Sequence, residues 1–273
     1  MASPVITSTR STRVVAARRL ATRAFRAKQR LFLAEGPQAV REAVAYASIT
    51  ELYFSQAAEE RHGELLDAAA ATGAALLPTT DDVVASLSDT VQPQGMVAVC
   101  RFLDQPLDQV LAAGPRLIAL LAQIRDPGNV GAVIRAADAA GADAVVVSDE
   151  SVDVYNAKAV RATAGSLFHL PIVLGVPTAA AIDRAKAAGL RVLAADGDGT
   201  LDLDDELDSG ALAAPTCWLF GNEARGLPED LRKTADAVVR VPIHGKAESL
   251  NLSTAAAVCL YASARAQRGH RRA

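Results

Sequence analysis

Short apolar strands alternate with helical stretches over the second half of the chain, and this alternation constrains the fold more than any other feature. Strands are expected at residues 117–121, 144–147, 171–174, 191–194, 217–220 and 237–242. Helices are expected at about 129–140, 155–168, 178–188, 228–235 and 249–267. The strands are rich in Val, Ile and Leu, which is typical of strands covered on both faces. The pattern predicts an α/β fold in which a parallel sheet carries helices on both sides.

The first 102 residues repeat this alternation on a smaller scale. Strands are expected at 31–34, 49–54, 74–78 and 95–102, and helices at 7–30, 37–47, 56–72 and 81–87. Pro106 and Pro115 interrupt the stretch that follows, which we interpret as a linker. We therefore expect a small α/β domain at 1–102, a linker at 103–116 and the parallel-sheet domain at 117–273. The acidic, glycine-containing stretch 196–210 is expected to be an exposed loop.

The composition is that of a globular protein. Of the 273 residues, 51% are hydrophobic and 22% are charged, which is enough to bury a core. No apolar run reaches the roughly 20 residues of a membrane span, and no apolar segment of a signal peptide follows the basic N-terminus. Cys100, Cys217 and Cys259 lie far apart among apolar residues, without metal-ligand spacing. We expect a cytoplasmic protein with buried thiols and no metal site.

Positive charge is concentrated at the start of the chain. The net charge of −3 argues against a nucleic-acid partner, but residues 1–34 contain basic side chains and no acidic one. This asymmetry predicts that the following residues bind RNA phosphates: Arg10, Arg13, Arg18, Arg19, Arg23, Arg26, Lys28 and Arg30. The alternative is a solvated helix face without a partner.

Three polar segments follow expected strands, at 126–135, 219–227 and 241–253. Parallel α/β proteins place their ligands in loops at the carboxyl ends of strands. Because a structural turn needs only one or two polar residues, their concentration here indicates one composite site. The chain contains neither a Gly-x-Gly-x-x-Gly fingerprint nor a Walker A motif, which disfavours a nucleotide-dependent oxidoreductase.

Several residues of these segments allow a structural and a functional interpretation. Asn129 could cap the helix after Pro127-Gly128, and Glu223 could pair with Arg225. Arg135 lies in an Ala-rich helical stretch, where it either bridges to an acid such as Asp138 or faces a site.

The third polar segment leads into the last helix. Ser249 is expected to be the N-cap of that helix, with Asn251 and Ser253 in its first turn. Three polar residues exceed what one cap requires, so some of them are expected to be free to contact a ligand.

Taken in order, the three segments resemble the motifs of the SpoU–TrmH family of RNA ribose 2′-O-methyltransferases, within the SPOUT superfamily. The motifs are Asp126-Pro-Gly-Asn-Val-Gly-Ala-Val-Ile-Arg135, Gly221-Asn-Glu-Ala-Arg-Gly226 and Val241-Pro-Ile-His-Gly-Lys-Ala-Glu-Ser-Leu-Asn-Leu-Ser253. The resemblance covers residues 117–265. Residues 1–100 resemble the RNA-binding domain of ribosomal-protein type that some members carry, through Phe32-Leu-Ala-Glu-Gly36. Ile243 stands where a methionine is common.

The resemblance implies a deep trefoil knot near the C-terminus and S-adenosylmethionine bound within it. The expected cofactor contacts are Gly221, Val241, Ser249, Leu250 and Asn251. The catalytic residues would be Arg135, Asn129, Glu223, Ser249 and Asn251, with Asn129 and Glu223 orienting Arg135 and the ribose. The family gives the first-motif arginine the role of base, but an arginine with a pKa above about 12 stays protonated at neutral pH. Arg135 could instead hold a phosphate and stabilise a developing alkoxide.

The resemblance also implies an RNA substrate and a homodimer. Ribosomal RNA is our first expectation because of the N-terminal domain, transfer RNA is the second, and a non-catalytic RNA-binding protein is an alternative. The helix expected at 249–267 is apolar around more of its circumference than one core-facing stripe requires. A second subunit could cover the remainder, or the helix could be buried within its own subunit.

Overall fold

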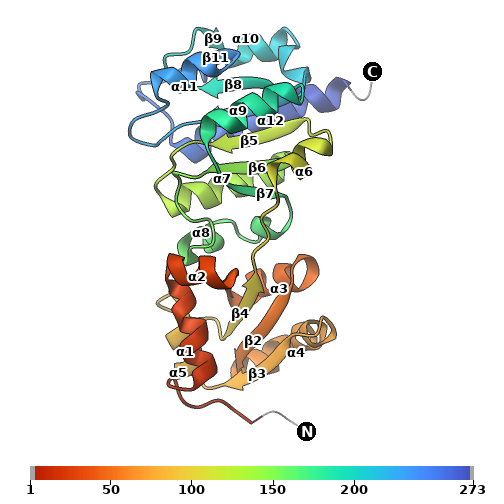
Figure 1. Ribbon diagram of the computed structural model, residues 1–273, viewed down its shortest axis with the longest axis vertical. Coiled ribbons are helices and arrows are strands. Elements are labelled where there is room, and N and C mark those ends of the chain that lie inside the picture. Colours follow the sequence, from red (N-terminus) through yellow and green to blue (C-terminus); the bar gives the residue numbers. More distant parts are fainter. Residues whose placement is uncertain (1–3, 271–273) are drawn as a thin grey trace. The chain divides into compact units, whose positions relative to one another are not determined.

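The structure is a computed structural model that describes residues 4–270 of the chain. The chain divides into two compact units (Figure 1). Unit 1 consists of Met1–Leu103 and Asp153–His169, and unit 2 of Asp104–Val152 and Leu170–Ala273. The segment Asp153–His169 thus packs with unit 1, although it lies within the range expected for the parallel-sheet domain. Part of the expected linker forms the helix α6, Leu107–Ala112.

Unit 1 is built on a mixed four-stranded sheet in the order β1-β4-β2-β3. Its strands are β1 (Leu31–Glu35), β2 (Ile49–Ser55), β3 (Ala75–Thr79) and β4 (Met96–Arg101). Its helices are α1 (Thr12–Arg18), α2 (Arg23–Gln29), α3 (Gly36–Tyr46), α4 (Gln56–Ala71), α5 (Asp81–Leu87) and α8 (Ala157–Ala162). Figure 1 shows α1 and α5 on one side of this sheet and α3 and α4 on the other.

The expected helix at 7–30 is wrong as a single element, because the chain breaks between α1 and α2. A 3-10 turn occupies Arg19–Ala21, and Thr22 is extended with φ −95° and ψ 134°. The Arg26 guanidinium Nη1 donates to the carbonyl oxygens of Leu20 and Ala21 at 2.7 and 2.8 Å. A continuous helix would satisfy these carbonyls through its own backbone, so the side chain of Arg26 stabilises the break.

Unit 2 contains a seven-stranded sheet in the order β7-β6-β5-β10-β8-β11-β9. All of its neighbouring strands pair in parallel, which confirms the predicted parallel α/β sheet. The strands are β5 (Leu117–Leu121), β6 (Ala144–Ser148), β7 (Ile172–Val176), β8 (Arg191–Ala195), β9 (Leu201–Asp202), β10 (Thr216–Phe220) and β11 (Ala237–Arg240). Every residue of β5, β6 and β10 is buried, so the core follows the centre of the sheet.

The helices of unit 2 are α6, α7 (Pro127–Ala140), α9 (Thr178–Ala187), α10 (Leu203–Asp208), α11 (Glu229–Thr234) and α12 (Leu252–His270). The C-terminal helix α12 packs against α7 and against the central strands. The Trp218 indole of β10 donates to Ser263 Oγ of α12 at 2.8 Å. This buried contact fixes α12 to the middle of the sheet.

Three further boundaries differ from the expected ones. The stretch 196–210 contains β9 and α10, because Asp202 caps α10 and Leu203 is buried. The expected helix at 155–168 is only α8 followed by a 3-10 turn, since Ala164 and Gly165 have φ values of 51° and 103°. The last helix begins at Leu252 instead of residue 249.

The three cysteines are buried free thiols, as expected. Within residues 4–270, no helix is long and apolar enough to cross a membrane. The same residues contain no group of His, Cys, Asp and Glu side chains that could hold a metal ion.

Candidate active site

The three polar segments come together at the carboxyl edge of the parallel sheet in unit 2. The first follows β5, the second follows β10 and the third follows β11. Strands that run parallel end at the same edge, which is why segments nearly 100 residues apart in sequence meet. The three segments therefore lie together at one edge, and their forming one functional site stays a prediction.

Glu223 is the centre of a polar cluster that joins the three segments. Its carboxylate accepts hydrogen bonds from the backbone N–H groups of Arg125 and Asp126 at 3.2 and 3.1 Å and from Asn129 Nδ2 at 3.1 Å. Asn251 Nδ2 donates to Asn129 Oδ1 at 3.2 Å. The cluster of Asn129, Glu223 and Asn251 therefore contains one side chain from each motif.

The environment of Glu223 favours its ionised form. Partial burial acts to raise the pKa of Glu223, but its hydrogen bonds, including those from Asn129, Asp126 and Arg125, outweigh that effect and leave the pKa below its usual value. An ionised carboxylate accepts hydrogen bonds and donates none. Glu223 therefore holds the β5–α7 loop and the Asn129 amide in place. The alternative ion pair between Glu223 and Arg225 is not formed among the described residues.

Two capping expectations are wrong, and both corrections release a side chain for the site. Asp126 caps α7 by accepting from Asn129 N at 2.9 Å, so the Asn129 amide is free to join the cluster. At the start of α12 it is Asn251, and not Ser249, whose Oδ1 accepts from Ser253 N at 2.9 Å. Ser249 lies outside the helix and lines the cavity described next.

A cavity of about 680 Å³ opens beside the cluster. It is lined by four of the five expected cofactor residues, Gly221, Val241, Ser249 and Leu250. The fifth, Asn251, belongs to the polar cluster instead. The cavity also contains Asp196 and Gly197, which sequence reasoning assigned to an exposed loop. Their position directly after β8, at the same sheet edge, was the signal that could have revealed them.

Gly221 lines the cavity, and its role as a cofactor contact stays a prediction. A Cβ at Gly221 would lie 2.5 Å from the carbonyl carbon of Gly226 and 2.7 Å from Leu227 N. Asn222 and Gly226 exchange backbone hydrogen bonds of 3.0 and 2.9 Å, which folds the loop back on itself. The chain's own backbone therefore excludes a side chain at Gly221.

Arg135 lies on α7, six residues after Asn129, with an exposed side chain. Among the described residues its guanidinium has no hydrogen bond or ion pair, so the alternative bridge to Asp138 is not formed. Asn129 and Glu223 hydrogen-bond to each other but not to Arg135. The structure thus leaves a free, exposed cation on the helix that carries the first motif.

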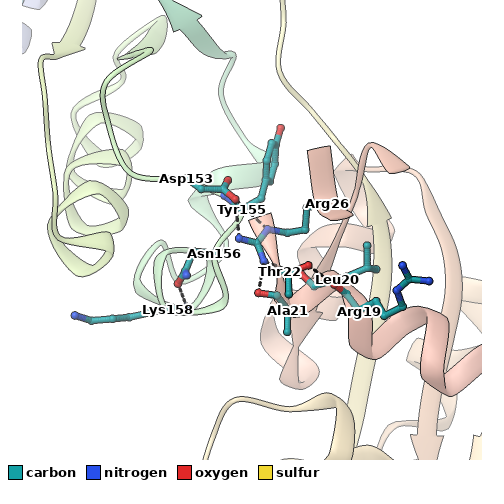
Figure 2. Close-up of polar contacts among 9 residues, drawn as sticks. All are labelled: Arg19, Leu20, Ala21, Thr22, Arg26, Asp153, Tyr155, Asn156 and Lys158. Carbon is teal, nitrogen blue, oxygen red and sulfur yellow. Dashed lines mark hydrogen bonds and ion pairs between the residues drawn. The ribbon is translucent and has the colours of Figure 1, made fainter. Parts of the chain in front are cut away.

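Of the eight basic residues at the N-terminus, seven are exposed. The exception is Arg26, which is 3% exposed. Its guanidinium donates to Asp153 Oδ2 through Nη2 at 2.7 Å and through Nε at 3.0 Å (Figure 2). Arg26 is therefore bound within the protein and is withdrawn from the set that could contact RNA. The guanidinium groups of Arg19 and Arg30 lie over the rings of Phe25 and Phe102.

Comparison with known families agrees with both units. The SpoU rRNA Methylase family matches residues 116–261, and the MRM3-like substrate binding domain matches residues 11–98. The chain is 32% identical over 257 residues to the 23S rRNA (guanosine(2553)-2′-O)-methyltransferase RlmP of Bacillus subtilis, covering 94% of this chain and 97% of that protein. It is also 32% identical to the 23S rRNA (guanosine-2′-O-)-methyltransferase RlmB of Ralstonia nicotianae, covering 80% and 88%.

Solved structures show the same fold over nearly the whole chain. An AdoMet-bound rRNA methyltransferase from Sinorhizobium meliloti is 31% identical with a TM-score of 0.84, covering 96% of this chain and 97% of that one. The SpoU methyltransferase AviRb from Streptomyces viridochromogenes, in complex with the cofactor AdoMet, is 29% identical with a TM-score of 0.82, covering 95% and 100%.

Proposed function

The chain belongs to the SpoU rRNA Methylase family, and we propose that it transfers the methyl group of S-adenosylmethionine to a ribose 2′-hydroxyl of 23S ribosomal RNA. The observation that carries this proposal is the cluster of Asn129, Glu223 and Asn251, which unites all three motifs beside a cavity. Relatives named for this reaction align with almost the whole chain. A ribosomal substrate is consistent with the cytoplasmic location expected from the sequence.

The cavity suits S-adenosylmethionine in size and in chemistry. Its volume of about 680 Å³ is in the range of small-molecule sites. Ile243, Leu250 and Leu252 supply apolar surface for an adenine, and Asp196 and Glu248 supply negative charge for a ligand with a positive sulfur. The segments after β10 and β11 also line the cavity through Gly221 and Val241. The residues present therefore fit this cofactor.

S-adenosylmethionine supplies an activated methyl group, so the chain's own residues must position the ribose and manage its proton. Glu223 fixes the start of α7 through the N–H groups of Arg125 and Asp126. Arg135 projects from that helix as an unpaired cation. A charged guanidinium can bind an RNA phosphate and stabilise negative charge on the 2′-oxygen. We assign this role to Arg135, since a neutral guanidine is costly at neutral pH.

Substitution at Arg135 tests the proposal. Arg135→Ala should lower methyl transfer by at least ~100-fold, the low end for a positioned catalytic group, with nearly unchanged S-adenosylmethionine affinity. Arg135→Lys should recover part of the loss because it keeps the charge but not the planar fork. Arg184→Ala on α9, where the arginine pairs with Asp108 outside the site, is the control for loss of an arginine elsewhere. Activity near wild type in Arg135→Ala would show that the assigned role is wrong.

Two alternatives are a non-catalytic RNA-binding protein and a nucleotide-dependent oxidoreductase. In a calorimetric titration, a methyltransferase should bind S-adenosylmethionine, an oxidoreductase should bind NAD, and the non-catalytic protein should bind neither. Mapping of 2′-O-methyl groups in ribosomal and transfer RNA, with and without the gene, identifies the substrate. A protein that binds RNA but neither binds S-adenosylmethionine nor adds a methyl group would refute the proposed function.

We also propose a C2 homodimer that includes α12. Val258 and Tyr261 on this helix are 40% and 53% exposed, and Tyr261 Oη donates to the carbonyl of Ala139 on α7 at 3.3 Å. Two large exposed apolar side chains on one helix suit a self-complementary surface. Light scattering at micromolar concentration should give twice the 28.4 kDa chain mass. A monomeric mass would refute this assembly.

A further inference from the structure

A cavity in unit 1 has no role in the methyl-transfer site. It has a volume of about 550 Å³ and is formed by α3, α4 and the loop before β4. Its polar lining consists of Gln38, Arg41, Arg61, His62, Gln92 and Gln94. We refer to it as the α3–α4 groove. Its lining combines cationic side chains with side-chain amides and contains no carboxylate.

The two arginines of the groove are not neutralised within the described part of the chain. Arg41 and His62 make no hydrogen bond or ion pair there, and Arg61 uses only its Nε, which donates to the carbonyl of Ala57 at 2.9 Å. The remaining guanidinium donors of Arg41 and Arg61 are therefore available to a ligand. A concave site with cations and without acids attracts anions, and the guanidinium fork matches a phosphate group.

The backbone around the groove is shaped in two unusual ways. Helix α4 is kinked at His62, where φ is −135° and ψ is 32°. Gly36 has a φ of 86°, and a Cβ there would lie 2.7 Å from Gln94 Oε1. Only glycine therefore allows the Gln94 amide to lie across the start of α3. On the same loop Val91, which precedes Gln92 in sequence, is 99% exposed.

These features match a nucleotide better than an isolated anion. The side-chain amides of Gln92 and Gln94 offer both donors and acceptors, and neither makes a hydrogen bond within the described residues. Proteins read single-stranded RNA by hydrogen bonds to the edges of unstacked bases.

We propose that the α3–α4 groove binds one nucleotide of single-stranded RNA, with Arg41 and Arg61 on its phosphate and the amides of Gln92 and Gln94 on its base. This inference rests on RNA being the substrate. Figure 1 shows α3 and α4 on the side of the sheet opposite α1. The groove is therefore a separate contact from the basic residues of the N-terminal run.

The test measures RNA affinity of the full chain as a function of salt, using a single-stranded fragment of 23S ribosomal RNA. The variant Arg41→Gln/Arg61→Gln should bind this RNA about tenfold more weakly at physiological salt. It should also reduce the slope of log K against log salt by about 0.7, the value for one phosphate contact on a single strand. Gln92→Ala/Gln94→Ala should weaken binding with an unchanged slope, because it removes no charge. Arg184→Gln on α9 of unit 2, which breaks the ion pair with Asp108, is the control for loss of an arginine outside the groove.

The outcomes separate this inference from the proposed function. Normal RNA affinity and salt slope in the double arginine variant, with wild-type methyl transfer, would overturn the groove and leave the function intact. A raised KM for RNA with unchanged kcat supports the groove as a binding site. Loss of affinity for inorganic phosphate but not for RNA would also overturn it. Arg41, Arg61, Gln92 and Gln94 are exposed, so both double variants should fold. A circular dichroism spectrum like that of the wild type would show this for each variant.

Discussion

Replacement of Arg26 by alanine should destabilise unit 1 strongly without acting through RNA. The side chain is 4% exposed and its partner Asp153 is 13% exposed. Four hydrogen bonds hold the guanidinium, two to Asp153 and two to the carbonyls of Leu20 and Ala21 (Figure 2). The substitution removes these four bonds and leaves the largely buried Asp153 carboxylate with the hydrogen bond from Tyr155 N at 2.9 Å.

The magnitude follows from this loss of partners. Removal of one member of a buried ion pair costs about 3–5 kcal/mol, because the other charge stays behind without compensation. For a unit of roughly 120 residues, each kcal/mol lowers Tm by about 4 °C. We therefore expect a decrease of roughly 12–20 °C in the Tm of unit 1. Arg23→Ala, at an exposed position of the same helix, should change stability by no more than about 0.5 kcal/mol.

The chain provides an internal control for this measurement. Its single tryptophan, Trp218, lies in β10 of unit 2. Tryptophan fluorescence therefore follows unit 2, while amide hydrogen exchange in β1 to β4 follows unit 1. Arg26→Ala should increase exchange in unit 1 and leave the fluorescence transition of unit 2 in place. An Arg26→Ala variant that keeps wild-type stability but loses RNA affinity would refute the structural role and restore the expectation of a phosphate contact.

Three further predictions concern the active site and the basic run. Glu223→Gln should remove a stabilising contribution to the free energy of unfolding that is present above pH 4.5 and lost as the pH falls through the lower folded pKa of Glu223. The free energies of unfolding of wild type and variant should therefore converge at acid pH, and a difference that stays constant with pH would contradict this. Gly221→Ala places a Cβ 2.5 Å from the Gly226 carbonyl carbon, so Tm should fall and the affinity for S-adenosylmethionine should fall by at least tenfold. A variant that binds S-adenosylmethionine with wild-type affinity would disprove the contact between Gly221 and the cofactor. Deletion of residues 1–30 would also remove the structural Arg26, so RNA binding is better tested by glutamine at the exposed Arg10, Arg13 and Arg18. This triple variant should lower the slope of log K against log salt by about 2 on single-stranded RNA. An unchanged slope would assign these residues to a solvated surface.

The hydrophobic pattern of the sequence was sufficient to predict the parallel sheet of unit 2. Strands buried on both faces must be apolar along their whole length, so β5, β6 and β10 are visible as Val-, Ile- and Leu-rich runs. The polar residues after β5, β10 and β11 also predict the site, because parallel strands end at one edge. The trefoil knot came only from the family resemblance, since chain-topology rules disfavour knots; it stays a prediction here.

Hydrogen bonds between distant segments depend on tertiary structure and were not visible in the sequence. Asn129 and Asp126 are both good helix caps, and only the approach of Glu223 from 94 residues away decides which one is used. Asn251 replaces Ser249 as a cap at the point where its amide reaches Asn129. Neighbouring residues can cap a helix with similar free energies, so a hydrogen bond from a distant segment can decide which residue is the cap.

Charge pattern along the sequence likewise could not distinguish the roles of basic residues. In sequence Arg26 resembles its neighbours, but folding brings Asp153, 127 residues away, against it. The segment Asp153–His169 then packs with unit 1, although the chain on both sides of it belongs to unit 2. The sequence by itself determined which residues are charged, apolar or polar at strand ends; only the tertiary structure decided which charges are neutralised inside the protein and which remain free for RNA.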